Sequence, residues 1–562
     1  MTGRVWLIVV GATAFAMLAG LLVWAGTSRG CGDTLTLTVA AAPEITPAVR
    51  EAAQRWSRTD PEASGRCVAV RVSGADPARL AAAIAAQHRD QLDVAGVEPS
   101  GIELPQVWIP DAATWVTRVR GVERKAVSAE PPSIAVSPVV LALPEPDARA
   151  EGWPSTRIGW DYVMAGMKAR PPLPVAVLEP RRSAAGLSGL LATGELARSA
   201  ANLAGTDPET AVLGTYRGLS LTRATTVDEL FGRLPRGADA PGQIRAALLP
   251  EYAVRAYDAT RPAVPLAAIY PEPAAPALDY PYATLAGLSP AETDAARQFR
   301  GWLLGKDTGT VLARRGFRTP DGAIGAGFPT DGGLSPESVR PPRPVDTETV
   351  ETALTWWTEV SLASRVLAVI DVSGSMDEPV PTAGGLSRLE VTRRAAASGL
   401  KLFTDDSQLG LWVFSTGLDG EKDYRELVPV GPLSSTRTKI TAALGGAATK
   451  TGGGTGLYDT VAAGYARMTA EYDPELSNTL VVMTDGVNED PSGITRDALV
   501  RRLGELSDPA KPVHVVILGI GPEVDKHELE TVTAATGGAV FVATDPSEIG
   551  EIFLKALALP SR

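Results

Sequence analysis

Cysteine, histidine and runs of basic residues are scarce in this sequence. The 562-residue chain has two cysteines and three histidines, and its 65 acidic residues outnumber its 53 lysines and arginines, giving a formal net charge of −12. A nucleic-acid-binding surface needs clustered Lys and Arg side chains, and the sequence has no such cluster. We therefore expect no nucleic acid among the partners of this protein.

The motifs of common enzymes are also missing. His527 lies in "DKHELE", which does not match the H-E-x-x-H of zinc proteases, and "GLSGL" lacks the spacing of G-x-S-x-G. The glycine-rich stretch "TKTGGGTG" is not a G-x-x-x-x-G-K-[ST] phosphate loop. The sequence thus predicts a binding protein that is not an enzyme.

One long apolar run lies near the N-terminus. Val5 to Gly26 read "VWLIVVGATAFAMLAGLLVWAG", 22 residues without a charge, and about 20 apolar residues suffice for a helix to cross a bilayer. We assign residues 1–30 to a membrane anchor, which predicts a single-pass cell-membrane protein. A cleaved export signal ending near Gly26 is the alternative, and it would make the protein secreted.

The two cysteines, Cys31 and Cys67, both lie near the start of the chain. In an exported chain such a pair indicates a disulfide, since disulfides persist outside the reducing cytoplasm. Two unpaired thiols in a core are the alternative. The disulfide interpretation places the bulk of the chain outside the cytoplasm.

Residues 31–328 alternate apolar strands with Ala-rich helical stretches. The strands include "LTLTVAAAPEI", "QVWIP", "SIAVSPVVLAL" and "VPLAAIYP", and this alternation predicts an α/β domain with parallel sheets. The order and spacing of the segments are similar to type 2 periplasmic substrate-binding proteins. That resemblance implies two α/β lobes with a cleft between them, and a chain that crosses between the lobes at Ser133–Leu143 and again near Val264–Tyr270.

Loops that follow the strands would line such a cleft and hold a small solute or an anion. Ser183 is the strongest candidate because "EPRRSAAG" offers a hydroxyl and free backbone amides at a helix N-terminus, beside two arginines. A plain helix cap is the alternative, and Asp111 has the same two interpretations. The full set of candidate solute contacts is Ala42, Pro43, Asp111, Ser137, Ser183 and Tyr280.

A stretch rich in Gly, Pro and Ser, "GAGFPTDGGLSPESVRPPRPVD", covers residues 325–346. It has no apolar periodicity, as expected of a linker between folded domains. We assign residues 329–361 to this linker and a lead-in helix, and residues 362–562 to a second domain. Apolar runs such as "RVLAVID", "TLVVMTD" and "PVHVVILGIG" predict that this domain is doubly wound and Rossmann-like, with a mostly parallel central sheet.

Oxygen-bearing side chains follow two of these predicted strands. Asp371, Ser373 and Ser375 form D-x-S-x-S, Thr455 lies in "TGGGTGLYD", and Asp485 lies in "MTDG". Ligands bind beyond the carboxyl ends of parallel strands, and hard oxygen donors with two carboxylates suit Mg²⁺, with Mn²⁺ and Ca²⁺ as alternatives. Taken alone, D-x-S-x-S is also compatible with the capped start of a helix.

These three motifs, in this order over residues 362–556, resemble the von Willebrand factor type A (vWA) domain with its metal-ion-dependent adhesion site. The resemblance implies that Ser373 and Ser375 bind the ion directly, Thr455 directly or through water, and Asp371 and Asp485 mostly through water. It also implies that an Asp or Glu carboxylate of a protein partner completes the coordination. Other polar residues nearby are predicted to be loop caps and turn residues: Asp377, Asp459, Asn488, Glu489 and Asp490.

The combined prediction is a membrane-anchored extracytoplasmic binding protein that joins a solute-binding-like domain to a metal-dependent, protein-binding vWA domain. The alternative is a solute receptor for a transporter or sensor, in which the vWA domain only docks a partner.

Overall fold

The computed structural model describes residues 33–543, apart from residues 89–90, 93, 98–100, 161, 164–174, 236–242, 331–332, 341–343, 446–450 and 522–523. The predicted membrane segment and Cys31 lie outside the described residues, so the anchor and the Cys31–Cys67 disulfide stay predictions. Within the described part of the chain, no helix is both long and apolar enough to cross a bilayer.

The chain divides into two compact units, and the first holds most of the N-terminal domain. This first unit comprises Met1–Tyr162, Leu178–Gly189 and Thr225–Val350. The second comprises Val163–Val177, Leu190–Ala224 and Glu351–Arg562, and it contains the whole C-terminal sheet.

A first sheet of five strands forms one lobe of the N-terminal domain. Its strands are β1 (Thr34–Ala41), β2 (Glu62–Ala63), β3 (Arg66–Gly74), β4 (Val107–Ile109) and β9 (Ala283–Thr284). They are ordered β2-β3-β1-β4-β9, with β1 parallel to β3 and β4, and with β2 and β9 antiparallel to their neighbours. Five helices belong to this lobe: α2 (Thr46–Ser57), α3 (Pro77–Gln87), α4 (Ala113–Val122), α11 (Pro290–Leu303) and α12 (Lys306–Ala313).

A second sheet forms the other lobe. Its strands are β5 (Val139–Pro144), β6 (Val175–Ala176), β7 (Ala246–Pro250) and β8 (Leu266–Ile269), in the order β6-β7-β5-β8. The helices of this part of the chain are α5 (Glu145–Ala150), α7 (Ala184–Ala204), α8 (Pro208–Ser220), α9 (Val227–Arg233) and α10 (Glu251–Ala259). The two sheets give the predicted two-lobed α/β domain.

Two details of the predicted N-terminal topology are wrong. The second sheet is not parallel, because β5 runs antiparallel to both β7 and β8. The predicted return to the first lobe near Val264–Tyr270 is also misplaced, since β8 pairs with β5 in the second sheet and the chain rejoins the first sheet only at β9. Apolar runs identify buried strands, but they do not tell which sheet a strand joins or in which direction.

The predicted linker is partly fixed to the N-terminal domain. Its described residues from 329 to 346 form no helix or strand, as expected. Two of its carbonyls, those of Ser335 and Glu337, nevertheless accept hydrogen bonds of 2.8 and 2.6 Å from the guanidinium of Arg318. That guanidinium also forms a buried ion pair with Glu251, with N–O distances of 2.6 and 2.8 Å. The segment around residues 335–337 therefore belongs to the folded domain.

A third sheet of six strands forms the centre of the C-terminal domain and follows α13 (Thr347–Ser361). Its strands are β10 (Ser364–Asp371), β13 (Gln408–Asp419), β14 (Lys422–Pro432), β15 (Ser477–Thr484), β16 (Val513–Ile520) and β17 (Ala539–Ala543). They are ordered β14-β13-β10-β15-β16-β17, and only β14 is antiparallel to its neighbour. The predicted doubly wound, mostly parallel sheet is confirmed.

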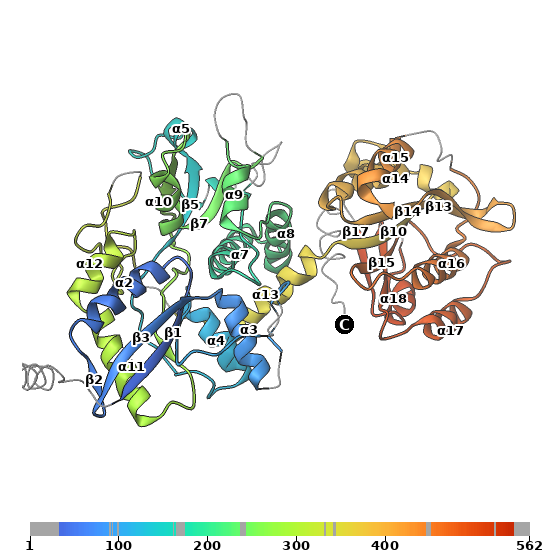
Figure 1. Ribbon diagram of the computed structural model, residues 1–562. Coiled ribbons are helices and arrows are strands. Elements are labelled where there is room, and N and C mark those ends of the chain that lie inside the picture. Colours follow the sequence, from blue (N-terminus) through green and yellow to red (C-terminus); the bar gives the residue numbers. More distant parts are fainter. Residues whose placement is uncertain are drawn as a thin grey trace, which may run out of the picture. The chain divides into compact units, whose positions relative to one another are not determined.

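Helices cover both faces of the third sheet (Figure 1). Val366 and Ile370 of β10 pack in one core with α14 (Arg388–Gly399) and α15 (Leu433–Gly445), whereas Leu367 and Val369 face the other core. The helices on that second face are α16 (Leu457–Ala470), α17 (Arg496–Leu506) and α18 (Lys526–Ala534). The short elements are η1 (Gly374–Asp377), β11 (Pro379–Val380), η2 (Pro381–Ala383), β12 (Leu386–Ser387) and η3 (Leu400–Leu402).

Candidate functional site

The two aspartates of the predicted metal site lie at the same edge of the third sheet. Asp371 is the last residue of β10, and Asp485 directly follows β15. These two strands are parallel neighbours in which Ile370 lies opposite Met483, so both carboxylates emerge at the carboxyl ends of the strands. Both side chains are almost fully buried.

The two serines connect these aspartates. The backbone amide of Ser373 donates a 2.8 Å hydrogen bond to Asp371 Oδ1, which turns the chain sharply after β10. The hydroxyls of Ser373 and Ser375 lie 3.1 Å apart, and that of Ser375 donates to Asp485 Oδ1 at 2.9 Å. Four of the five predicted ligands thus form one connected group. The helix-start alternative fits less well, because neither serine caps the η1 turn with its side chain.

Thr455 comes from a third loop that is tied to the other two. The Gly374 amide donates to the Gly453 carbonyl at 3.0 Å, and the Glu489 amide donates to the Thr455 carbonyl at 2.8 Å. A Cβ placed on Gly486 would lie 4.0 Å from the Thr455 hydroxyl, so this hydroxyl adjoins the residue after Asp485. Gly453 has a φ of +80°, a conformation that side chains disfavour and glycine allows.

The buried carboxylate of Asp371 has no cationic partner among the described residues. Its hydrogen bonds come from neutral groups, namely the Ser373 amide and the Thr484 hydroxyl, which donates to Oδ2 at 2.6 Å. Burial, with a smaller contribution from Asp485, raises the pKa of Asp371 to about 6. Thr484 was not predicted, although it directly precedes Asp485 in "MTDG".

Arg388 is a second unpredicted neighbour of the site. It is the first residue of α14, and its guanidinium pairs with Asp485 Oδ2 at 2.9 Å and with Glu378 at 2.8 Å. Its side chain is only 11% exposed. No motif around Arg388 indicated this contact, because the arginine reaches the site only through the fold of the loop before α14.

The donor set fits a hard divalent cation. Carboxylate and hydroxyl oxygens from three loops supply the group, without nitrogen or sulfur, which is the chemistry that Mg²⁺, Mn²⁺ and Ca²⁺ accept. The residues that would hold the ion are the five predicted ones: Asp371, Ser373, Ser375, Thr455 and Asp485.

Three further carboxylates gather elsewhere in this domain. Oxygens of Asp423, Asp459 and Asp490 all lie within 4.8 Å of one another. Asp459 accepts a hydrogen bond from the Ile494 amide and Asp490 from the Ser492 amide, so both fix a loop as predicted. Burial raises the pKa of Asp423, and the two neighbouring aspartates add to this effect. Asp423, from β14, was not predicted because no motif marks it and the pairing of β13 with β14 brings it there.

Other predicted turn residues also make local contacts. The Asn488 side chain accepts a hydrogen bond from the Tyr458 amide at the start of α16, and Asp377 accepts one from the Thr451 hydroxyl. The Glu489 amide bonds the Thr455 carbonyl.

The predicted solute contacts of the N-terminal domain are only partly brought together. The carbonyl of Asp111 accepts a hydrogen bond from the Tyr280 amide at 3.1 Å, and Tyr280 has a strained φ of +39°. The Tyr280 hydroxyl donates to Glu44 at 2.9 Å. Ser137, fully buried, accepts a hydrogen bond from the Tyr252 amide at the start of α10.

Asp111 and Ser183 differ in whether their side chains cap a helix. Asp111 is not the cap of α4, because Ala112 occupies that position. Its carboxylate accepts the indole N–H of Trp115 at 2.9 Å. Burial, with the charge of Glu44, raises its pKa well above the usual value. The Ser183 hydroxyl accepts the Gly186 amide at 3.2 Å, the contact of a helix cap.

The remaining predicted solute contacts are Ala42 and Pro43. Ala42 is buried and its amide donates to the Ile109 carbonyl, while Pro43 is exposed beside it. Arg182, adjacent to Ser183, pairs with Asp76 at 3.4 Å.

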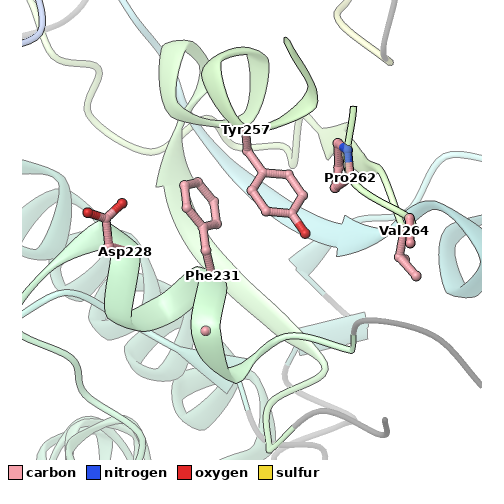
Figure 2. A pocket seen from close by; sticks show the side chains of 7 residues that line it. Asp228, Phe231, Tyr257, Pro262 and Val264 are labelled. Atoms are coloured by element: carbon pink, nitrogen blue, oxygen red, sulfur yellow. The ribbon is translucent and has the colours of Figure 1, made fainter. Parts of the chain in front are cut away.

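A hollow of about 400 Å³ lies between α9 and α10 (Figure 2). The rings of Phe231 and Tyr257 face each other in it with centroids 4.5 Å apart, and Asp228 lies at its edge. No predicted ligand residue lines it.

The fold and the connected oxygen site define a protein with a two-lobed α/β domain followed by a vWA domain. A family model described as "Bacterial extracellular solute-binding protein" matches residues 37–318, and one described as "von Willebrand factor type A domain" matches residues 366–555. The first match covers 282 of the 562 residues, so the chain belongs to the bacterial extracellular solute-binding proteins.

Individual relatives span both domains or one of them. The chain is 27% identical over 564 residues to the uncharacterized protein Rv1836c of Mycobacterium tuberculosis (strain ATCC 25618 / H37Rv), covering 93% of this chain and 78% of that protein. It is similar to the solved von Willebrand factor type A protein from Catenulispora acidiphila, with 22% identity, a TM-score of 0.28, and coverage of 35% of this chain and 42% of that one. It is also similar to the sulfate-binding protein SubI from Mycobacterium tuberculosis H37Rv, with 18% identity, a TM-score of 0.35, and coverage of 53% and 92%.

Proposed function

We propose that this protein is a membrane-anchored extracytoplasmic binding protein whose vWA domain captures a protein partner through a divalent cation. The observation that carries the proposal is the connected set of oxygen side chains at one sheet edge, in which the Ser375 hydroxyl joins the D-x-S-x-S loop to Asp485 at 2.9 Å. When bound, the cation would supply a coordination position for a carboxylate of the partner.

The residues of the site have separate roles in this proposal. The hydroxyls of Ser373, Ser375 and Thr455 hold the ion, and the carboxylates of Asp371 and Asp485 balance its charge and orient its waters. Mg²⁺ is the proposed ion, and Mn²⁺ and Ca²⁺ accept the same donors. The partner would present an Asp or Glu side chain.

The location and the absence of an enzymatic role belong to the same proposal. The uncharged segment Val5–Gly26 supports a membrane anchor, and the pair Cys31 and Cys67 supports an extracytoplasmic position for both domains. Membership in an extracellular solute-binding family supports the same position. Binding of a partner and a small solute, rather than catalysis, is the proposed activity.

Calorimetric titration of the purified full-length chain with Mg²⁺ and Mn²⁺ tests the metal role. We expect Ser373→Ala to lower the affinity at least about 100-fold, since a lost ligand costs more than a lost outer-shell contact. Ser398→Ala, an exposed serine of α14, is the matched control and should bind as the wild type does. Unchanged binding by Ser373→Ala would refute the proposal.

The partner chemistry has its own test. An immobilised peptide library rich in Asp and Glu should retain the full-length chain in Mg²⁺, and chelation should release it. A library with Asn and Gln in place of the acids should retain none. Equal retention by both libraries, or retention that survives chelation, would contradict capture through the cation.

A second candidate function is that of a solute receptor in which the vWA domain only docks a partner. The family match over the N-terminal domain favours it. In that case a thermal-shift screen of oxyanions, sugars and amino acids should find a solute that raises the melting temperature, and silence across the screen would favour the first function.

A further inference from the structure

A cavity of about 280 Å³ lies in the first unit, and chain segments far apart in sequence line it. Glu44 follows β1, Tyr252 and Arg255 belong to α10, and Arg314, Arg315 and Phe317 lie at and beyond the end of α12. Its lining therefore combines a carboxylate, three guanidinium groups and two aromatic rings.

The lining includes a carboxylate without a cation. Glu44 accepts a hydrogen bond from the Tyr280 hydroxyl at 2.9 Å, and no Lys, Arg or His of the described residues forms an ion pair with it. Burial raises the pKa of Glu44. A second partly buried acid, Asp111, interacts electrostatically with it and adds to the negative potential. A positively charged ligand group would relieve the cost of burying these acids.

The basic residues differ in whether their charges are neutralised. Arg315 pairs with Glu51 at 2.9 Å. Arg255 and Arg314 form no ion pair among the described residues, and Arg255 Nε is buried without a hydrogen-bond acceptor. The stem of Arg255 lies against Gly316, where an added Cβ would approach its Cδ to 2.8 Å. A buried donor without an acceptor is costly, and a guanidinium forms strong charge-assisted hydrogen bonds to a carboxylate.

Two aromatic rings form a wall of the cavity. The rings of Tyr252 and Phe317 stack with centroids 5.6 Å apart at 24°, and Phe317 meets Tyr280 edge-on at 5.2 Å. Tyr280 in turn bonds Glu44. The wall offers apolar surface to a small aliphatic or aromatic group.

We propose that this cavity binds a small zwitterion, an α-amino acid with an apolar side chain, whose ammonium group pairs with Glu44 and whose carboxylate pairs with Arg255 and Arg314. The inference rests on the part of the proposed function that gives the N-terminal domain a solute, and it is independent of the metal site. Glu44 disfavours a simple oxyanion such as sulfate, because like charges would be buried together.

The test is calorimetric titration of the full-length chain in the presence of a chelator. The probes are L-leucine, L-alanine and L-phenylalanine, with 3-methylbutan-1-amine and 4-methylpentanoate as leucine analogues that lack one charged group, and sulfate. We expect an amino acid to bind, both analogues to bind at least about 10-fold more weakly, and sulfate not to bind, since each analogue loses one charge-assisted contact. Binding of sulfate alone, equal binding of an analogue, or no amino-acid binding would overturn the proposal.

Variants locate the binding to this cavity. Glu44→Gln, Arg255→Gln and Arg314→Gln should each lower amino-acid affinity at least about 10-fold. Arg297→Gln, on the exposed face of α11, is the matched control. If a buried substitution prevents folding, the exposed Arg314 decides the question, and unchanged affinity in Arg314→Gln would contradict the proposal. Titration of each folded variant with Mg²⁺ separates this outcome from failure of the metal site.

Discussion

Two buried carboxylates, Glu251 in the N-terminal domain and Asp371 in the vWA domain, differ in what neutralises them. Glu251 forms a two-point ion pair with Arg318, and both side chains are fully buried. Asp371 is bonded only by neutral donors, and burial raises its pKa to about 6. A buried charge that the chain itself neutralises depends on its partner, because removal of that partner leaves the charge uncompensated, whereas one left without a counter-charge is a place where a cation can bind.

The largest effect on the free energy of unfolding is expected at the buried ion pair of Glu251 and Arg318. Arg318→Met leaves Glu251 buried without a counter-charge and removes the bonds to Ser335 and Glu337, so we expect a loss of about 3–5 kcal/mol in the free energy of unfolding. Calorimetric melting of the full-length chain measures it. Arg297→Met, which breaks an ion pair with a 67% exposed arginine, should cost less than about 1 kcal/mol. Equal effects of the two substitutions would show that the buried ion pair matters no more to stability than the exposed one.

Removal of the unneutralised charge of Asp371 should raise the free energy of unfolding instead of lowering it. Burial raises the pKa of Asp371 from the usual 3.8 to about 6 in the folded chain, so ionisation of this carboxyl group opposes folding. This destabilisation is fully present above about pH 6 and absent below about pH 4. In a chelator at pH 7.5, Asp371→Asn should stabilise the vWA domain by up to about 3 kcal/mol.

The pH dependence provides the control for this prediction. At pH 4 the two proteins should differ little, and with Mg²⁺ at pH 7.5 only the wild type should gain stability, because a ligand that binds the native state stabilises it. Destabilisation by Asp371→Asn at pH 7.5 in chelator would contradict the account.

A smaller effect, on metal affinity, is expected from substitution of Arg388, whose guanidinium lies beside the site. Arg388 pairs with Asp485 and would compete with a metal ion for it. We expect Arg388→Gln to tighten Mn²⁺ binding by about 5-fold, which corresponds to ~1 kcal/mol. Arg394→Gln, an exposed arginine paired with Glu390 on the same helix, should change nothing. Weaker binding by Arg388→Gln would mean that the arginine positions Asp485 instead.

The smallest effect concerns Ser183 as a structural residue. Its hydroxyl bonds the Gly186 amide, so Ser183→Ala should lower the free energy of unfolding by about 0.5–1 kcal/mol, the cost of a lost helix cap. Ser183→Asn should restore stability, and Ser199→Ala, at an exposed position within α7, is the control. Identical melting of the alanine variants at positions 183 and 199 would remove the cap interpretation.

The C-terminal domain was largely predictable because its motifs are attached to strand ends. Buried parallel strands have recognisable lengths and compositions, and residues that follow two of them must meet at one edge, as Asp371 and Asp485 do. Thr484 could have been included from the same motif. Arg388 and Asp423 could not, because each reaches its neighbours through a loop or hairpin whose path the sequence does not specify.

The N-terminal domain was predictable in outline only. Its two lobes follow from alternating strands and helices, but the antiparallel pairing of β5 with β7 and β8 depends on which sheet each strand joins. The predicted solute contacts Ala42 and Ser137 are both buried, and each forms a hydrogen bond with a backbone group of another segment. The cavity residues Glu44 and Arg255 lie far apart in sequence, on a loop and a helix that carry no motif.

The most direct test of the central claim is anomalous diffraction from crystals of the protein grown with Mn²⁺. A peak roughly 2.1 Å from the hydroxyl oxygens of Ser373 and Ser375, with one coordination position filled by water or a carboxylate from another molecule, is the predicted result. No peak there, or a peak only among Asp423, Asp459 and Asp490, would contradict the account.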